Sequence, residues 1–141
     1  MKYMLDTNII AYAINRRHPQ VLQNLHDHLQ DELCISAITM AELEYGICNS
    51  SRPEQNRAAL MLFLAPIEVL PFDGFAAAEY GRIRADLKRR GNPIGANDML
   101  IAAQAKACGC TLVSNNLKEF QKVEGLQTEN WTAALEHSPS L

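Results

Sequence analysis

Short apolar runs alternate with longer stretches of helical periodicity along this 141-residue chain. The short runs predict strands at residues 3–5, 33–36, 68–71 and 111–114. The longer stretches predict helices at residues 8–16, 19–30, 38–48, 54–64, 75–90 and 97–107. Because strands that alternate with helices are usually joined by crossover connections, the pattern favours an α/β sandwich, with a short central parallel sheet flanked by helices.

Turn-forming and capping residues mark the ends of several predicted helices. Gly91 and Pro93 end the helix that precedes them. Asn97 is expected to cap the helix that follows, and Ser36 is expected to cap the helix at residues 38–48.

The composition is that of an ordinary globular chain, with 48% apolar and 21% charged residues. No repeat, linker or low-complexity tract is evident, so residues 1–132 are predicted to form one domain. The apolar pattern ends beyond Trp131, and residues 133–141 are predicted to form a flexible tail. No signal peptide or bilayer-length apolar run is recognisable, which predicts a cytoplasmic protein without membrane association.

Cysteine usage and net charge narrow the function classes. Cys34, Cys48, Cys108 and Cys110 form no C-x-x-C pair, and we expect mostly buried, reduced thiols rather than disulfides or zinc ligands. The formal net charge of −3 does not favour a nucleic-acid-binding protein. A function on nucleic acid would therefore depend on a local concentration of basic side chains.

Three acidic residues occur in apolar surroundings. Asp6 follows the first predicted strand, and ligands of parallel sheets gather at the carboxyl ends of strands. Glu42 shares a helix face with Ile38 and Tyr45. Asp98 opens a helix that is apolar nearly all round, which is typical of a buried helix. The three acids are therefore predicted to face the interior or a cleft.

Each acid also has a purely structural explanation. Asp6 or Thr7 could cap the first helix, and Asp98 could complement the dipole of its own helix. Glu42 could be half-exposed or paired with an arginine. Taken together the three acids are harder to explain in this way, because few basic residues lie in the segments that look buried.

Convergence of the three acids would create a metal site. Two carboxylates about 4 Å apart repel each other by roughly 4 kcal/mol at an effective dielectric constant near 20. A divalent cation removes this repulsion, and oxygen ligands without clustered His or Cys suit Mg²⁺ or Mn²⁺. Such an ion can activate water and neutralise a phosphate, so the residues favour metal-assisted hydrolysis of a phosphodiester.

Four segments together resemble the PIN-domain ribonucleases, and more narrowly the VapC toxins of bacterial toxin–antitoxin pairs. The segments are MLDTNIIAY at the N-terminus, SAITMAELEYG, GNPIGANDMLIAAQA and TLVSNNLKEF. The similarity runs from Met1 to about Trp131, in the order and spacing of the family. A single segment such as LDTN would be a weak match, whereas four in register are specific.

The resemblance implies an α/β/α sandwich whose acids hold Mg²⁺ or Mn²⁺ at the carboxyl edge of the sheet. Asp6 and Asp98 match the principal metal ligands of the family. Glu42 completes the catalytic acids, as the residue that orients the attacking water or shares the ion. Thr7 and Asn8 match the polar pair that braces the first acid, although helix capping explains them equally well.

The end of the last predicted strand departs from the commonest family pattern. Ser114 matches the family's hydroxyl there, but Asn116 stands where many PIN domains have a fourth aspartate. The amide of Asn116 can bind an ion or a water but adds no charge. Glu119 can be interpreted equally well as a substitute carboxylate or as a surface acid, which leaves one-ion and two-ion chemistry open.

Basic residues crowd the end of the helix predicted at 75–90. Asp86 is the only acid among them, and cations near a helix C-terminus also have a structural role, because they stabilise the helix dipole. We nevertheless expect part of this cluster to lie beside the acidic site and to bind RNA. The residues are Arg82, Arg84, Lys88, Arg89 and Arg90.

The resemblance also implies a substrate and partners. By similarity to enteric-type VapC toxins, the substrate would be initiator tRNA, cut in the anticodon loop to leave a 5′-phosphate and a 3′-hydroxyl. A VapB-type antitoxin would inhibit the enzyme by placing a basic side chain among the acids. A homodimer formed through apolar helical surfaces is also implied.

Two other functions are compatible with the sequence. An aspartyl-phosphate phosphatase would use Asp6, but such enzymes need a second acid two residues later, where Asn8 stands. A non-catalytic PIN-like scaffold that binds RNA or protein is favoured by Asn116. The presence of Asp6, Glu42 and Asp98 argues against the scaffold.

Overall fold

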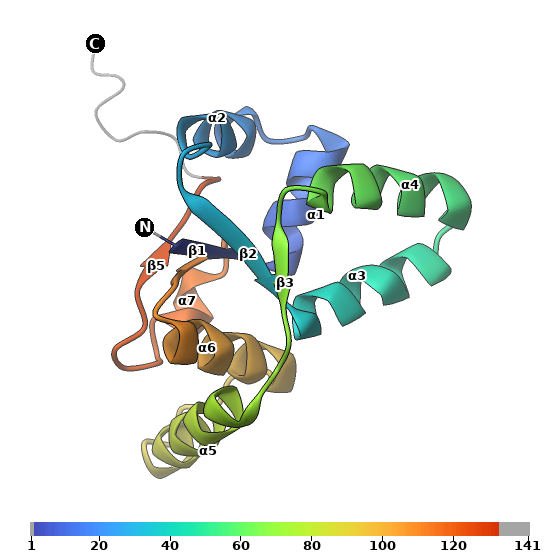
Figure 1. The fold of residues 1–141 in the computed structure, drawn as a ribbon. Coiled ribbons are helices and arrows are strands. Elements are labelled where there is room, and N and C mark those ends of the chain that lie inside the picture. The colour runs from blue at the N-terminus through green and yellow to red at the C-terminus, as the bar shows by residue number, and fades with distance from the viewer. Residues whose placement is uncertain (1, 133–141) are drawn as a thin grey trace.

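Five parallel strands form the centre of the computed structural model, which describes residues 2–132 (Figure 1). They lie in the order β3-β2-β1-β4-β5, and all neighbours pair in parallel, which confirms the predicted parallel sheet. The predicted tail at residues 133–141 lies outside the described residues. The strands are β1 (Lys2–Leu5), β2 (Glu32–Ser36), β3 (Glu68–Leu70), β4 (Thr111–Val113) and β5 (Thr128–Glu129).

Seven helices connect these strands within residues 2–132. The six predicted helices are all present, and their ends differ from the predicted ends by at most three residues. The sequence pattern does not predict β5 or α7, because segments this short show no periodicity. The helices are α1 (Thr7–Asn15), α2 (Pro19–Asp27), α3 (Ala37–Cys48), α4 (Pro53–Leu64), α5 (Gly74–Arg89), α6 (Ala96–Cys108) and α7 (Leu117–Phe120). None of them is long and apolar enough to cross a membrane.

Alternate residues of the central strand face two different helical layers. Met4 packs on one face of the sheet, in a core with residues of α5 and α6. Tyr3 and Leu5 pack on the other face, with residues of α1, α2, α3 and α4 and with Trp131. Successive side chains of a strand point to opposite faces, so one strand supplies both cores. The result is the expected α/β/α sandwich, with α5 and α6 on one side of the sheet and α1, α2 and α4 on the other (Figure 1).

All four cysteines are free thiols. Cys34 and Cys110 are buried with their sulfur atoms 3.8 Å apart, whereas Cys48 and Cys108 are exposed. The expectation of unpaired thiols is confirmed. The expectation of mostly buried thiols holds for Cys34 and Cys110 alone, because Cys48 and Cys108 lie at the exposed C-terminal ends of α3 and α6.

The direction of the strand order reverses at β1. From β1 the chain moves outward through β2 to β3, and it then returns to form β4 on the other side of β1. In α/β sheets such a reversal opens a crevice at the carboxyl ends of the two strands concerned. Here these ends lead into Asp6 and Ser114, so the fold itself creates a place for a ligand beside Asp6.

The buried side chain of Gln104 joins α6 to two other elements beneath this edge. Its Oε1 accepts a hydrogen bond from Ser36 Oγ at 2.5 Å, and its Nε2 donates to the carbonyls of Leu70 and Pro71 at 3.0 and 2.7 Å. Ser36 also caps α3, because its Oγ accepts the N–H of Ile38 at 2.9 Å, as expected. The network therefore sets the position of α3 relative to α6.

Replacing Gln104 by Met should destabilise the fold, because the change keeps the volume but leaves the buried partners of the amide unsatisfied. We expect the free energy of unfolding, measured by urea denaturation, to fall by about 2–4 kcal/mol. Gln55→Met, at an exposed position of α4, is the matched control and should change the value by less than about 0.5 kcal/mol. An equal effect of the two changes would contradict the role given to the network.

Candidate active site

The three predicted acids line one small cavity at the carboxyl edge of the sheet. The cavity has a volume of about 150 Å³, and none of the described residues that line it is basic. The lining residues are Asp6, Thr7, Asn8, Glu42, Asp98, Ile101 and Asn116. They come from the start of α1, from α3, from α6 and from the segment after β4. The structure therefore brings together acids that are up to 92 residues apart in the chain.

Asp6 is the most buried of the three acids, with 6% of its surface exposed. Its Oδ1 accepts the N–H of Ile9 at 3.0 Å, so Asp6 caps α1, and its carboxylate also accepts a hydrogen bond from Ser114. Burial raises the pKa of Asp6 to about 6, in spite of these two hydrogen bonds, and the charges of Asp98 and Glu42 add to the rise. The capping role and the place in the cavity therefore belong to the same carboxylate.

Glu42 is held from two sides. The hydroxyl of Thr7 donates to its Oε1, and Asn97 Nδ2 donates to its Oε2 at 3.1 Å. Thr7 belongs to α1 and Asn97 to α6, so Glu42 of α3 joins three helices at the wall of the cavity. These bonds fix the direction of the carboxylate.

The hydrogen bonds of Thr7 and Asn8 differ from those that the resemblance implies. Rather than bracing Asp6, Thr7 binds Glu42, and Asn8 Nδ2 donates to Asn115 Oδ1 at 3.4 Å. The reason is that α1 already begins at Thr7, and consecutive side chains of a helix point about 100° apart. Thr7 therefore reaches α3, while Asn8 reaches the segment after β4.

Asp98 lies in the first turn of α6 and is partly buried. The chain passes beside its carboxylate at Gly95, where a Cβ atom would lie 3.6 Å from Oδ2, in ordinary van der Waals contact. Asn116 Nδ2 is 3.5 Å from the same oxygen. Burial raises the pKa of Asp98, and the negative charges of Glu42 and Glu119 act in the same direction.

The segment after β4 contributes the remaining predicted residues in different ways. Ser114 is fully buried and accepts the N–H of Asn116 at 2.8 Å, so it supports Asp6 from behind the cavity. Asn116 lines the cavity itself. Glu119 is not among the lining residues and lies 3.5 Å from Lys122 Nζ, although its charge reaches Asp98. The amide of Asn116 rather than Glu119 therefore completes the cavity.

The oxygen donors of this cavity fit a hard divalent cation. A volume of about 150 Å³ corresponds to roughly five water molecules of about 30 Å³ each. Mg²⁺ typically takes one or two carboxylates and keeps several waters. Within residues 2–132 no three His, Cys, Asp or Glu side chains are grouped so that they could hold a metal ion. Asp6 and Asp98 are the carboxylates that could hold such an ion, and water and the amide oxygen of Asn116 could complete its shell.

Two asparagines beside the cavity are absent from the sequence-based set of site residues. Asn97 binds Glu42, and Asn115 accepts from Asn8 and donates to the hydroxyl of Tyr12 at 2.9 Å. The expectation that Asn97 caps α6 is wrong, because Gly95 occupies the cap position and Asn97 lies inside the first turn. A polar residue next to Asp98 in an otherwise apolar helix is the signal that could have identified Asn97.

The predicted basic cluster divides between two sides of α5. Lys88 lines a groove next to the start of α6. Arg82 and Arg89 line a separate groove, which also includes Lys106 near the other end of α6. Arg90 donates to Asp86 Oδ2 at 2.6 Å and to the carbonyl of Lys122 at 2.6 Å.

The raised pKa of Asp6 predicts a pH-dependent loss of stability. Between the ordinary value of 3.8 and about 6, the folded protein binds more protons than the unfolded chain, so stability falls as the pH rises through this window and stays lower above it. Asp6→Asn keeps a capping side chain but removes the buried charge. In metal-free protein near pH 8 we expect the variant to be more stable by about 1–3 kcal/mol.

Denaturation at two pH values measures this effect. The gain of Asp6→Asn should vanish near pH 3, below both pKa values, and saturating Mg²⁺ should stabilise the wild type more than the variant. Asp73→Asn changes the exposed cap of α5 in the same way and controls for the exchange of a capping carboxylate. If Asp6→Asn were less stable than the wild type near pH 8 without metal, burial of the charged Asp6 carboxylate would not be destabilising.

Comparisons with known proteins show which family the chain belongs to. The family model of the PIN domain matches residues 3–126. Ribonuclease VapC2 of Haemophilus influenzae is 46% identical over 131 residues, which cover 93% of this chain and 98% of that protein. The tRNA(fMet)-specific endonuclease VapC of Shigella flexneri is 42% identical, over 94% of this chain and 99% of that protein.

A solved structure extends the agreement to the fold. The crystal structure of VapBC2 from Rickettsia felis bound to a DNA fragment from their promoter has a chain with a TM-score of 0.88 and 42% identity. The match covers 93% of this chain and 99% of that chain. Family match, sequence identity and shared fold all span nearly the whole molecule. This chain therefore belongs to the PIN-domain family and, within it, to the VapC ribonucleases.

Proposed function

We propose that this protein is the toxin of a type II toxin–antitoxin system and acts as a metal-dependent endoribonuclease. The observation that carries the proposal is the meeting of Asp6, Glu42 and Asp98 at one cavity, where no lining residue among residues 2–132 is basic. The identity of 46% to a protein named Ribonuclease VapC2 supports the same activity. Hydrolysis of a phosphodiester in RNA is the reaction that this donor set and these relatives have in common.

Asp6 and Asp98 would hold the ion, which we propose to be Mg²⁺ or Mn²⁺. When bound, the ion lowers the pKa of a water molecule and neutralises charge on the phosphate. Asp6 is held in place by Ser114 and by the N–H of Ile9, so its carboxylate is fixed before the ion arrives. Asn116 lies beside Asp98 and can offer its amide oxygen or hydrogen-bond a water.

Glu42 would orient the attacking water and accept its proton. Thr7 and Asn97 each donate one hydrogen bond to Glu42. Each carboxylate oxygen keeps a further lone pair that can accept a hydrogen bond or a proton from the water. The water oxygen attacks phosphorus in line with the bond to the 3′ oxygen of the preceding nucleotide. That bond breaks as the new one forms, which leaves a 5′-phosphate on one fragment and a 3′-hydroxyl on the other.

Initiator tRNA, cut in the anticodon loop, is the substrate that we propose. The support is the 42% identity to the protein named tRNA(fMet)-specific endonuclease VapC in Shigella flexneri. A protein that acts on tRNA would work in the cytoplasm. The cavity has room for an ion and a few waters, so the RNA must lie across its mouth and be recognised by the surrounding surface.

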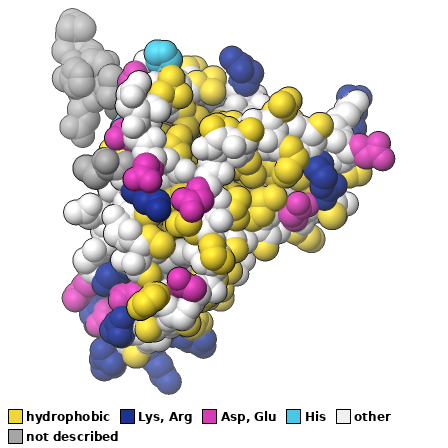
Figure 2. Space-filling model, in the orientation of Figure 1, with side chains coloured by type: hydrophobic (Ala, Val, Ile, Leu, Met, Phe, Trp, Pro, Cys, Tyr) yellow, Lys and Arg dark blue, Asp and Glu magenta, His cyan; other side chains and the backbone are white. Residues whose placement is uncertain are grey.

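A VapB-type antitoxin is the proposed protein partner, and a homodimer is the proposed assembly. The similarity to a chain of the Rickettsia felis VapBC2 structure supports the first. Apolar side chains gather over α3 and α4 in Figure 2. Tyr45 of α3 and Leu62 of α4 are 70% and 80% exposed. Exposed apolar surface of this kind supports contact with a partner chain. An antitoxin would block the site by inserting a basic side chain among the acids.

Cleavage of total tRNA by the purified protein tests the proposed activity. With Mg²⁺ or Mn²⁺ we expect cleavage of one tRNA species, located by sequencing of the fragment ends. Cleavage should disappear with EDTA and in Asp6→Asn, because either change removes the ion. Binding without cleavage under any metal would instead favour the scaffold, and release of phosphate from small monoesters would favour the phosphatase.

Glu42→Gln should lower kcat by about 10²–10⁴-fold, because the amide cannot accept the proton of the attacking water. Glu44→Gln is the matched control, since Glu44 lies on the same helix and pairs with Arg57 at 2.5 Å instead of lining the cavity. The control should retain nearly full kcat. Single-turnover cleavage rates measure both, and equal rates for the two variants would remove Glu42 from the mechanism.

A further inference from the structure

A groove between α5 and α6, here called the α5–α6 groove, opens next to the acidic cavity. Its volume is about 570 Å³, within the range of about 300–1,000 Å³ typical of sites for small ligands. The acidic cavity, at about 150 Å³, is much smaller. The lining residues of the groove are Arg84, Leu87, Lys88, Gly91, Pro93, Ile94, Ala96 and Met99. A nucleotide excluded from the cavity would find room in this groove.

The groove and the cavity share a border at the start of α6. Ile94 and Ala96 line the groove, and Gly95 between them approaches the Oδ2 atom of Asp98. Within α6, Ala96 and Met99 face the groove, whereas Asp98 faces the cavity. A strand with one phosphate at the cavity therefore has its adjoining nucleotides within reach of the groove.

Two cations on the rim of the groove have no acidic partner among residues 2–132. Arg84 donates to the hydroxyl of Tyr80 at 2.8 Å, and its guanidinium lies 6.0 Å from the centre of that ring. Lys88 lies one turn further along α5 and makes no ion pair with any described residue. Stabilisation of the helix dipole explains Lys88, in the last turn, but not Arg84, which lies outside it.

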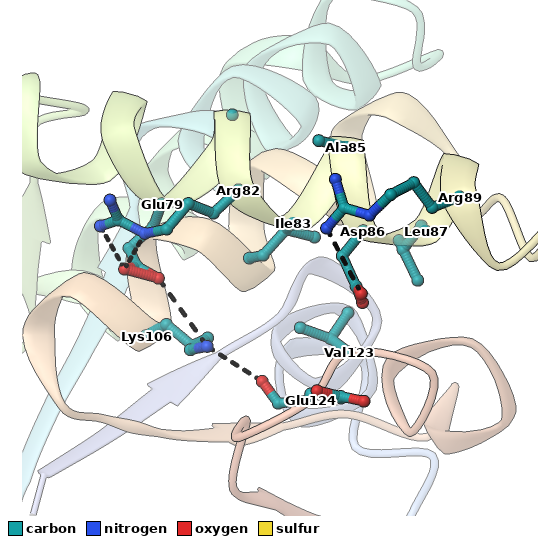
Figure 3. Close-up of a pocket in the computed structure, with 11 residues that line it drawn as sticks. Glu79, Arg82, Ile83, Ala85, Asp86, Leu87, Arg89, Lys106, Val123 and Glu124 are labelled. Carbon is teal, nitrogen blue, oxygen red and sulfur yellow. Dashed lines mark hydrogen bonds and ion pairs between the residues drawn. The ribbon is translucent and has the colours of Figure 1, made fainter.

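The larger groove on the other side of α5 is different, because its cations are already neutralised (Figure 3). Its volume is about 620 Å³. Arg82 pairs with Glu79 at 2.7 Å, and Lys106 lies 3.8 Å from the same carboxylate. Arg89 lies 3.9 Å from Asp86. An anion entering this groove would have to compete with these carboxylates, so size alone does not make it the better site.

We propose that the α5–α6 groove binds RNA next to the bond that is cut, with Arg84 and Lys88 on a phosphate. Tyr80 holds the planar guanidinium of Arg84, which favours bidentate binding of phosphate oxygens. Pro93 is exposed at this groove, and Ile94 and Met99, each 8% exposed, form its apolar floor, against which a base could pack. This inference rests on the proposed function and adds the surface that holds the substrate.

RNA binding by two double variants tests the proposal. Fluorescent tRNA is titrated with each protein in the presence of EDTA, which prevents cleavage. The proteins are the wild type, the first variant Arg84→Gln/Lys88→Gln and the second variant Arg82→Gln/Arg89→Gln. The second variant is the control, because it removes the same charge from the other side of α5. We expect the first variant to bind about tenfold or more weakly at low salt. The slope of log affinity against log salt should flatten by about 0.7, for the one single-strand phosphate that the two cations contact. In the second variant, the loss of affinity and the change of salt slope should each be less than half of those in the first.

Kinetics and a conservative variant separate binding from folding. Lys88→Arg keeps the positive charge and should therefore retain the affinity that Lys88→Gln loses. The first double variant should raise KM for tRNA more than it lowers kcat. Unchanged affinity and salt slope in that variant would overturn the proposal, and so would equal losses in the two double variants. Loss of antitoxin binding with intact RNA binding would assign the groove to a protein instead. If the wild type cleaves no tRNA with any metal, the proposed nuclease function fails while the binding comparison still decides the groove.

Discussion

The burial of one carboxylate at the end of the central strand is the constraint on which the structure depends. Asp6 follows β1, where the strand order reverses, and the fold surrounds it with apolar layers on both sides. Loss of hydration is the largest of the effects that raise its pKa to about 6, and the charges of two further acids nearby contribute to the rise. The arrangement is unfavourable for an empty protein and favourable for one that binds a cation there. A destabilised site of this kind is typical of catalytic centres.

The walls of the cavity depend on contacts between helices that are distant in sequence. Gln104 and Ser36 connect α6 to the start of α3, and Thr7 and Asn97 hold Glu42 from α1 and α6. Every acid of the cavity therefore has a direction set by a neighbour on another element or by the backbone. The cavity that they enclose is small, at about 150 Å³, which is why the proposed contacts with RNA lie on a different surface.

The basic side chains of α5 differ in whether they have an acidic partner. The chain carries a net charge of −3, and five basic residues within nine positions look at first like one patch. Arg82 pairs with Glu79, and Arg89 and Arg90 share Asp86, whereas Arg84 and Lys88 have no acidic partner among residues 2–132 and line the groove on the other side. A protein with negative net charge can therefore still present a positive border to its acidic cavity.

The sequence by itself determined the order of six helices and four strands, the parallel sheet and the three candidate acids. Periodicity locates long helices, and a carboxylate in apolar surroundings such as Asp6 or Asp98 is unusual enough to be noticed. The tertiary structure alone decided that Thr7 braces Glu42, that Asn97 belongs to the site and that Asn116 rather than Glu119 lines the cavity. It also decided which cations of α5 are neutralised. These facts depend on side-chain directions and on contacts between residues dozens of positions apart, which hydrophobic periodicity does not encode.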